Sequence, residues 1–205
     1  MNHHYLITSF FESGANDDIR QIALDMRENG FAVVRGLIPD IEEYCDKIVA
    51  DVSNEFHFET IENDNNEHLK KVEPRRIINA AKKYESVSSV ASHEKVLDLL
   101  TRLYGRQAYP FQTLNFPMGT EQHFHTDSIH FSSYPEKFMA GVWVALEDIS
   151  MDQGPLVYYP GTHKWPVFEN VHYGIDIRKR EGKFHQSAYE EAWRAMIEAE
   201  GIEPQ

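Results

Sequence analysis

The chain has 205 residues, 41% of them hydrophobic and 26% charged, which is ordinary for one globular domain with a buried core. A formal net charge of -13 disfavours binding to nucleic acid, because the phosphate backbone is negative as well. The single cysteine excludes an intrachain disulfide. The sequence has no pattern of a membrane span or a signal peptide, so we expect a cytoplasmic protein that contacts no membrane.

Three amphipathic helices are predicted in the first half of the chain. The first spans residues 17–29, where apolar residues recur on one face. The second opens at Pro39 and carries Cys45 on its apolar stripe, a position where a small buried thiol is the common case. A polar stretch at 54–73 predicts a loop, and the third helix then starts at the cap candidate Ser92.

Strand patterns dominate the middle of the chain. Aromatic and β-branched runs at 109–116, 138–146 and 155–159 are separated by turn residues, which is typical of antiparallel sheet. Near the end, a capping-box pattern opens a predicted helix from Ser187 to Gly201. The order is therefore helices first, then a β region, then one late helix, which favours an α+β fold.

The densest group of potential metal ligands is the segment EQHFHTDSIH, residues 121–130. Within it, His125 and Asp127 form an H-x-D pair, and residues two apart on an extended segment point to the same side. Two histidines and one carboxylate on one face of an ion suit iron(II) and leave positions open for O2 and a co-substrate. Because three-residue patterns occur by chance, the tripeptide alone favours a polar pair on an edge strand.

Other histidines compete for a place in such a site. His123 also lies two residues before His125, and these two could bind zinc together with a further ligand. His130 follows Asp127 by three residues and should face differently, so we expect both His123 and His130 to line a pocket or contact solvent. His163 follows a Pro-Gly turn, where a structural or outer-sphere role is more common than metal binding.

Taken together, these segments resemble the phytanoyl-CoA dioxygenase family of iron(II)- and 2-oxoglutarate-dependent oxygenases. The resemblance runs from about Gly30 to Pro166. Its motifs are GFAVVRGL (30–37), HEKVLDLL (93–100), FQTLNF (111–116), HTD (125–127), VWVALED (142–148) and GPLVYYPGTHK (154–164). This ordered set is specific, whereas the H-x-D tripeptide is not.

The resemblance implies a single oxygenase domain over residues 1–205. Its core would be a double-stranded β-helix, or jelly roll, buttressed by the N-terminal helices. Residues 1–108 would form the mainly helical buttress, residues 109–166 the jelly-roll strands with the H-x-D pair, and residues 167–205 a loop and a helix.

By the same resemblance, His125 and Asp127 bind Fe(II), and no catalytic residue is assigned beyond these ligands. Gln112 and Asn115 match positions beside 2-oxoglutarate, and Trp143 matches a tryptophan that lines the co-substrate pocket. The other interpretation of Gln112 and Asn115 is an inward polar pair in a sheet. The implied reaction uses O2 to hydroxylate a small organic substrate, because related halogenases lack the carboxylate that Asp127 supplies.

The family pattern also requires a distal histidine ligand and an arginine that binds 2-oxoglutarate, and neither is identified in this sequence. After Lys164 the histidines are His172 and His185, and no convincing strand carries either. The last arginines are Arg178, Arg180 and Arg194. About five strands are predicted, whereas a jelly roll closes with about eight. We therefore expect a fragment, truncated at the C-terminus before the final strands, with an incomplete and inactive site.

Three other interpretations remain open. A short but active variant would recruit His172 or His185 as its third ligand. A non-catalytic relative would bind a ligand without turnover. A cupin-like jelly-roll protein would use another divalent metal, and binding of manganese or zinc without any response to 2-oxoglutarate would favour it. The pattern predicts neither the substrate nor the oligomeric state.

Overall fold

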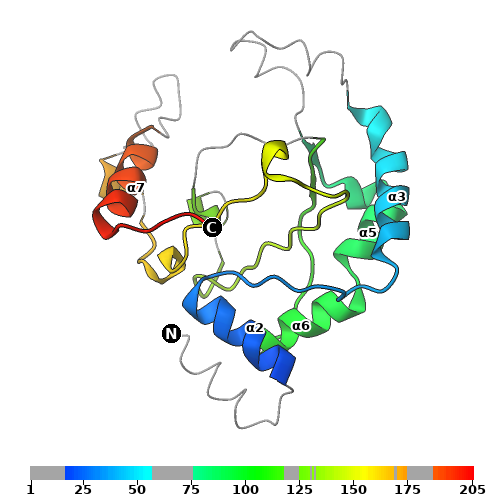
Figure 1. Cartoon of the computed structure of the whole chain (residues 1–205), viewed down its shortest axis with the longest axis horizontal. Helices are drawn as coiled ribbons and strands as arrows, with labels where there is room; N and C mark the ends of the chain where they lie inside the picture. Colours follow the sequence, from blue (N-terminus) through cyan, green and yellow to red (C-terminus); the bar gives the residue numbers. More distant parts are fainter. Residues whose placement is uncertain are drawn as a thin grey trace. The chain divides into compact units, whose positions relative to one another are not determined.

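The computed structural model of the chain (Figure 1) describes residues 17–56, 76–117, 125–129, 131, 133–168, 170–174 and 187–205. These residues belong to two compact units. The first unit contains the described residues within 17–33, 125–140 and 156–205, and the second contains those within 34–117 and 141–155. Within the described ranges, no helix is long and apolar enough to cross a membrane.

Helices α2 (Asp17–Glu28) and α7 (Ser187–Glu200) belong to the first unit and confirm the first and last predicted helices. On α2, Ile19 and Ala23 lie one turn apart and are both buried, as the apolar periodicity predicts. Gly30 follows α2 with a positive φ of 91°, a backbone conformation that suits glycine. The sequence pattern alone was enough to find these two helices.

Helix α3 (Ile41–Val52) of the second unit confirms the second predicted helix, although it does not begin at Pro39. Asp40 has a left-handed backbone, with a φ of 53°, so the chain turns before the helix starts. Cys45 is buried on α3, and its Sγ lies 3.6 Å from the carbonyl oxygen of Ala145. Burial raises the pKa of this thiol, which fits the structural role that was predicted.

Helix α6 (Glu94–Tyr104) confirms the third predicted helix, but its cap is not Ser92. The side chain of His93 caps the helix instead, because its Nδ1 accepts a hydrogen bond from the Lys95 N–H at 3.3 Å. The Ser92 hydroxyl donates to the carbonyl oxygen of Ser88, in the preceding helix. Ser92 therefore ends one helix, and the residue after it starts the next.

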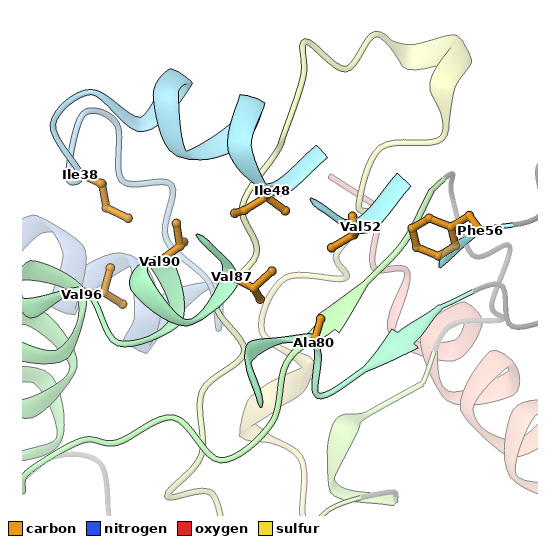
Figure 2. Packing of buried hydrophobic residues seen from close by; sticks show 8 residues of the cluster. All are labelled: Ile38, Ile48, Val52, Phe56, Ala80, Val87, Val90 and Val96. Carbon is orange, nitrogen blue, oxygen red and sulfur yellow. The ribbon is translucent and has the colours of Figure 1, made fainter. Parts of the chain in front are cut away.

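The core of the second unit is built largely by α3 and by α5 (Glu85–Ala91), a helix that the sequence analysis did not predict. The two helices lie side by side in Figure 1. Figure 2 shows the buried side chains gathered around them, namely Ile38, Ile48, Val52, Phe56, Ala80, Val87, Val90 and Val96. Fully burying a valine or isoleucine contributes roughly 1.5–3 kcal/mol, so this packing stabilises a helix of only seven residues.

The sheet of the described residues is small. Strand β1 (Ile77–Ile78) pairs antiparallel with β2 (Leu114–Asn115), with Ile77 opposite Asn115. Of the three predicted strand runs, only 109–116 contains a strand within the described residues. A strand requires a hydrogen-bonded neighbour, and apolar alternation alone does not supply one. The described residues thus combine helices with little sheet.

Both units also contain short helices of the 3-10 type. In the second unit they are η1 (Ser53–Glu55), η3 (Ala80–Lys82) and η5 (Met151–Gln153). In the first unit they are η4 (Asp127–Ile129), η6 (Thr162–Lys164) and η7 (Asn170–Tyr173). The predicted polar loop at 54–73 lies largely outside the described residues.

Candidate metal centre

His125 and Asp127 lie close together in the first unit, as the H-x-D pattern predicts. The Nε2 atom of His125 is 3.6 Å from Oδ1 of Asp127, and the two side chains are 27% and 58% exposed. Two donors that share one first-row divalent ion, each about 2 Å from it, lie roughly 3–4 Å apart. An imidazole nitrogen and a carboxylate oxygen are also donors that iron(II) accepts. The pair therefore fits a single ion with both side chains still open to solvent.

The backbone around the pair differs from the extended strand that was expected. Asp127 opens the short helix η4, and its carbonyl oxygen accepts a hydrogen bond from the Phe131 N–H at 2.9 Å. The hydroxyls of Thr126 and Ser128 lie 3.0 Å apart and share a hydrogen bond. A tight turn, and not a sheet neighbour, thus brings the histidine and the carboxylate to the same side.

Two tyrosines that the sequence analysis did not predict lie at this segment. The buried Tyr189 of α7 accepts a hydrogen bond at its hydroxyl from the Thr126 N–H, at 2.7 Å. Tyr158 stacks on Phe31, with ring centroids 4.7 Å apart, and its pKa is raised, first by burial and then by the charge of Asp127. Tyr158 stands within the GPLVYYPGTHK motif, but nothing in the apolar run singled it out.

The ionisation of Tyr158 tests how strongly it senses Asp127. We expect its pKa to lie above the usual value of about 10 and to fall toward that value in Asp127→Asn, because no negative charge then opposes the phenolate. Subtracting the ultraviolet titration of Tyr158→Phe from that of each parent isolates this group. The change Asp18→Asn, at an exposed carboxylate of the same unit that does not act on the Tyr158 pKa, should have no effect. An unchanged curve in Asp127→Asn would leave burial as the sole cause.

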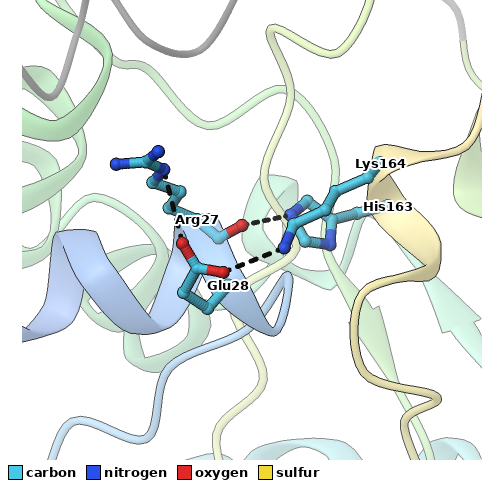
Figure 3. A network of polar contacts seen from close by, with 4 residues as sticks. All are labelled: Arg27, Glu28, His163 and Lys164. Carbon is cyan, nitrogen blue, oxygen red and sulfur yellow. Dashed lines mark hydrogen bonds and ion pairs between the residues drawn. The ribbon is translucent and has the colours of Figure 1, made fainter.

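His163 has a structural role, which is the more common one for a histidine after a turn. Its Nε2 lies 3.0 Å from the carbonyl oxygen of Arg27 at the end of α2, and that oxygen can only accept, so Nε2 carries the hydrogen (Figure 3). Next to it, Lys164 pairs with Glu28 at 3.1 Å. Lys137 donates to the carbonyl oxygens of His163 and Trp165, at 2.9 and 2.7 Å. These contacts join α2 to the PGTHK turn.

The remaining predicted competitors do not complete the site within the described residues. His172 lies in η7, where its ring meets Phe168 edge to face at 6.1 Å. In the part of the chain that the structure describes, no group of three or more His, Cys, Asp or Glu side chains could hold an ion. Outside the described residues lie His123, His130, His185, Arg178 and Arg180. The third ligand therefore stays unidentified.

The three residues predicted to bind 2-oxoglutarate belong to the second unit. Asn115 is in β2, and among the described residues no group donates to its buried Oδ1. Gln112 precedes β2 and is half-buried, while Trp143 is 51% exposed. Half a turn about χ2 of Asn115 exchanges its oxygen and nitrogen, so the buried position can offer a carboxylate two N–H donors. This amide is thus a polar group whose chemistry fits an anionic ligand.

A family model matches most of the chain. The family model described as "Phytanoyl-CoA dioxygenase (PhyH)" matches residues 26–201. The matched range includes the H-x-D pair, the three predicted co-substrate residues and all of α7. No curated protein and no solved structure matches the chain.

Proposed function

Because the chain belongs to the phytanoyl-CoA dioxygenase family, we propose that it is an Fe(II)- and 2-oxoglutarate-dependent dioxygenase that hydroxylates a small organic substrate. Members of the family are oxygenases, which implies O2 and a small-molecule substrate. The observation that carries the proposal is the separation of 3.6 Å between His125 Nε2 and Asp127 Oδ1, inside the matched range. The jelly roll of the family is part of the proposal.

In this proposal His125 and Asp127 hold the ion. The imidazole binds through a nitrogen that has lost its proton, so acid pH weakens binding by protonating His125. The carboxylate is an anionic oxygen donor, which lowers the net charge of the complex and suits a divalent metal. When bound, iron(II) would supply O2 activation, with O2 as the oxidant and 2-oxoglutarate as the co-substrate that is oxidised to succinate and carbon dioxide. The protein's own task is to fix the donors and to leave room for the co-substrate.

Gln112, Asn115 and Trp143 are proposed to bind 2-oxoglutarate. The amides of Gln112 and Asn115 offer N–H donors to the carboxylates, and a buried amide binds an anion more strongly than one in water does. The indole of Trp143 is a large apolar surface that excludes water from a bound ligand. Among the described residues no group donates to the Asn115 Oδ1, so the side-chain amide is free to turn about χ2, and the proposal requires the orientation that places its N–H donors at the buried position.

Coupled consumption of 2-oxoglutarate and release of succinate tests the function. Purified protein with iron(II), 2-oxoglutarate and O2 should form succinate and carbon dioxide in equal amounts without the primary substrate, provided that ascorbate is added as the two-electron donor that reduces the second oxygen atom to water. The reaction should stop when a chelator removes the metal, because the proposed site depends on it. Zinc in place of iron(II) serves as the matched control, since it binds the same donors but has no redox chemistry.

Each outcome distinguishes between the candidate functions. Iron-dependent succinate supports the dioxygenase and contradicts the expectation of an incomplete and inactive site. Metal binding with no effect of 2-oxoglutarate on either metal affinity or O2 consumption would instead support a binding protein or an enzyme that uses another metal. Failure to bind any divalent metal at neutral pH would remove the H-x-D pair as a metal site.

A further inference from the structure

Tyr189 is held rigidly by the aromatic side chains around it in the first unit. It is 2% exposed, and its ring lies 5.8 Å from the ring of Trp193, one turn further along α7. Trp193 in turn contacts Trp165 at 5.1 Å and Phe168 at 6.5 Å. Such ring pairs contribute about 0.5–1.5 kcal/mol each beyond the burial of their surface. The phenol ring therefore has little freedom to move.

The hydroxyl of this fixed ring meets the segment that carries the H-x-D pair. The Thr126 N–H donates to the Tyr189 oxygen at 2.7 Å, across 63 residues of sequence. That N–H belongs to the peptide bond between His125 and Thr126, so the hydrogen bond restrains the first of the two peptide planes that link His125 to Asp127. A buried phenol requires a hydrogen-bond partner, and here the partner is the backbone of the candidate site.

We propose that Tyr189 is a positioning residue for the metal ligands. Its hydroxyl fixes the backbone between His125 and Asp127, so that their donor atoms stay within reach of one ion before the metal arrives. The tight turn of η4 sets the local conformation, whereas Tyr189 anchors that turn to α7. Pre-positioned donors bind a metal more tightly because less conformational freedom is lost on binding. The inference rests on the proposed function, since it assumes that the pair binds a metal.

The change Tyr189→Phe removes the hydroxyl and keeps the ring, so it tests the anchor and leaves the aromatic packing intact. Amide hydrogen exchange at Thr126, measured without metal, should become faster in the variant because its N–H loses the acceptor. Co(II), used as a spectroscopic probe, should bind about 5- to 30-fold more weakly, as expected if the backbone of about one residue must then be ordered when the metal binds. Its visible absorption bands should also change, because the donors are no longer held in one geometry.

Trp193→Phe is the matched control, because it weakens the same aromatic cluster and leaves the Tyr189 hydroxyl in place. It should lower the unfolding temperature more than Tyr189→Phe does, yet leave Co(II) affinity within about twofold and the Co(II) spectrum unchanged. Equal affinity and an unchanged spectrum in Tyr189→Phe would overturn the positioning role. The positioning role would also be overturned if Co(II) affinity fell in both variants in proportion to their loss of stability.

The two proposals fail in different ways in this experiment. If the unchanged protein binds no Co(II), the metal site of the proposed function is wrong, and the positioning role is lost with it. If the unchanged protein binds Co(II) and Tyr189→Phe binds it equally well, the positioning role alone is wrong. The exchange rate at Thr126 reports on the hydrogen bond in either case.

Discussion

Replacing Asp127 by alanine is expected to weaken iron(II) binding by more than about 100-fold. Loss of a hydrogen-bond partner outside the ligand shell already costs a metal site up to about 100-fold in affinity, and loss of a ligand should cost more. The change removes one donor outright and with it the negative charge beside the imidazole. Because the Asp127 side chain is 58% exposed, the fold should tolerate its loss with a change in stability of about 0.5 kcal/mol or less. Metal content after dialysis against iron(II), with the unfolding temperature as a check, measures both effects.

His125→Ala should give the same loss, since either donor alone leaves the ion with a single known protein ligand. The control is Glu200→Ala, an exposed carboxylate of the first unit about 16 Å along α7 from Tyr189, which should retain full iron binding. Formation of succinate should disappear in both site variants and persist in the control. Iron content that survives in both Asp127→Ala and His125→Ala would show that the metal is held elsewhere.

Replacing Gly30 by alanine is expected to destabilise the protein by about 2–4 kcal/mol, the largest effect on stability that we predict. Gly30 has a φ of 91°, which strains any residue with a Cβ, and that Cβ would lie 2.5 Å from Nδ1 of His163. The imidazole cannot move away without weakening its contact with the Arg27 carbonyl oxygen (Figure 3). For a chain of this size the unfolding temperature should fall by roughly 5–15 °C.

Two comparisons separate backbone strain from the clash with His163. Gly174→Ala has a similar positive φ of 68°, and among the described residues no atom lies within 4 Å of its Cβ, so it should show the strain alone, about 1–2 kcal/mol. In a His163→Ala background the clash is gone, and Gly30→Ala should then cost less by about 1 kcal/mol or more. Equal costs of Gly30→Ala in the two backgrounds would contradict the close packing of Gly30 and His163.

The helices show how far local patterns predict this fold. The first and last helices follow from apolar residues spaced one turn apart, and both were found almost to the residue. The short helix α5, with the sequence ESVSSVA, has too few residues and too many serines to give such a pattern. It forms because Val87 and Val90 are buried in the core with α3. The cap of α6 was misassigned by one residue, since a histidine is not among the common caps.

The candidate site also combines a feature that the sequence predicts with one that only tertiary packing creates. His125 and Asp127 could be paired from the sequence because residues two apart on an extended segment point to the same side, although the structure brings them together by a tight turn. The spacing of Tyr189, Trp193 and Ile197 is typical of a buried helix face, which hid the role of the Tyr189 hydroxyl. Its partner, Thr126, is 63 residues away, and no periodic pattern carries that information.

Local chemistry thus accounts for most of the helices, for the H-x-D pair and for the order of motifs that identifies the family. These features depend on residues within a few positions of each other, where steric preference and spacing along the backbone act directly. Packing between distant segments accounts for the rest: the helix α5, the junction of His163 with Gly30, and the anchoring of the ligand segment by Tyr189. These contacts exist because burial brings distant side chains together, and the sequence alone does not state which ones will meet.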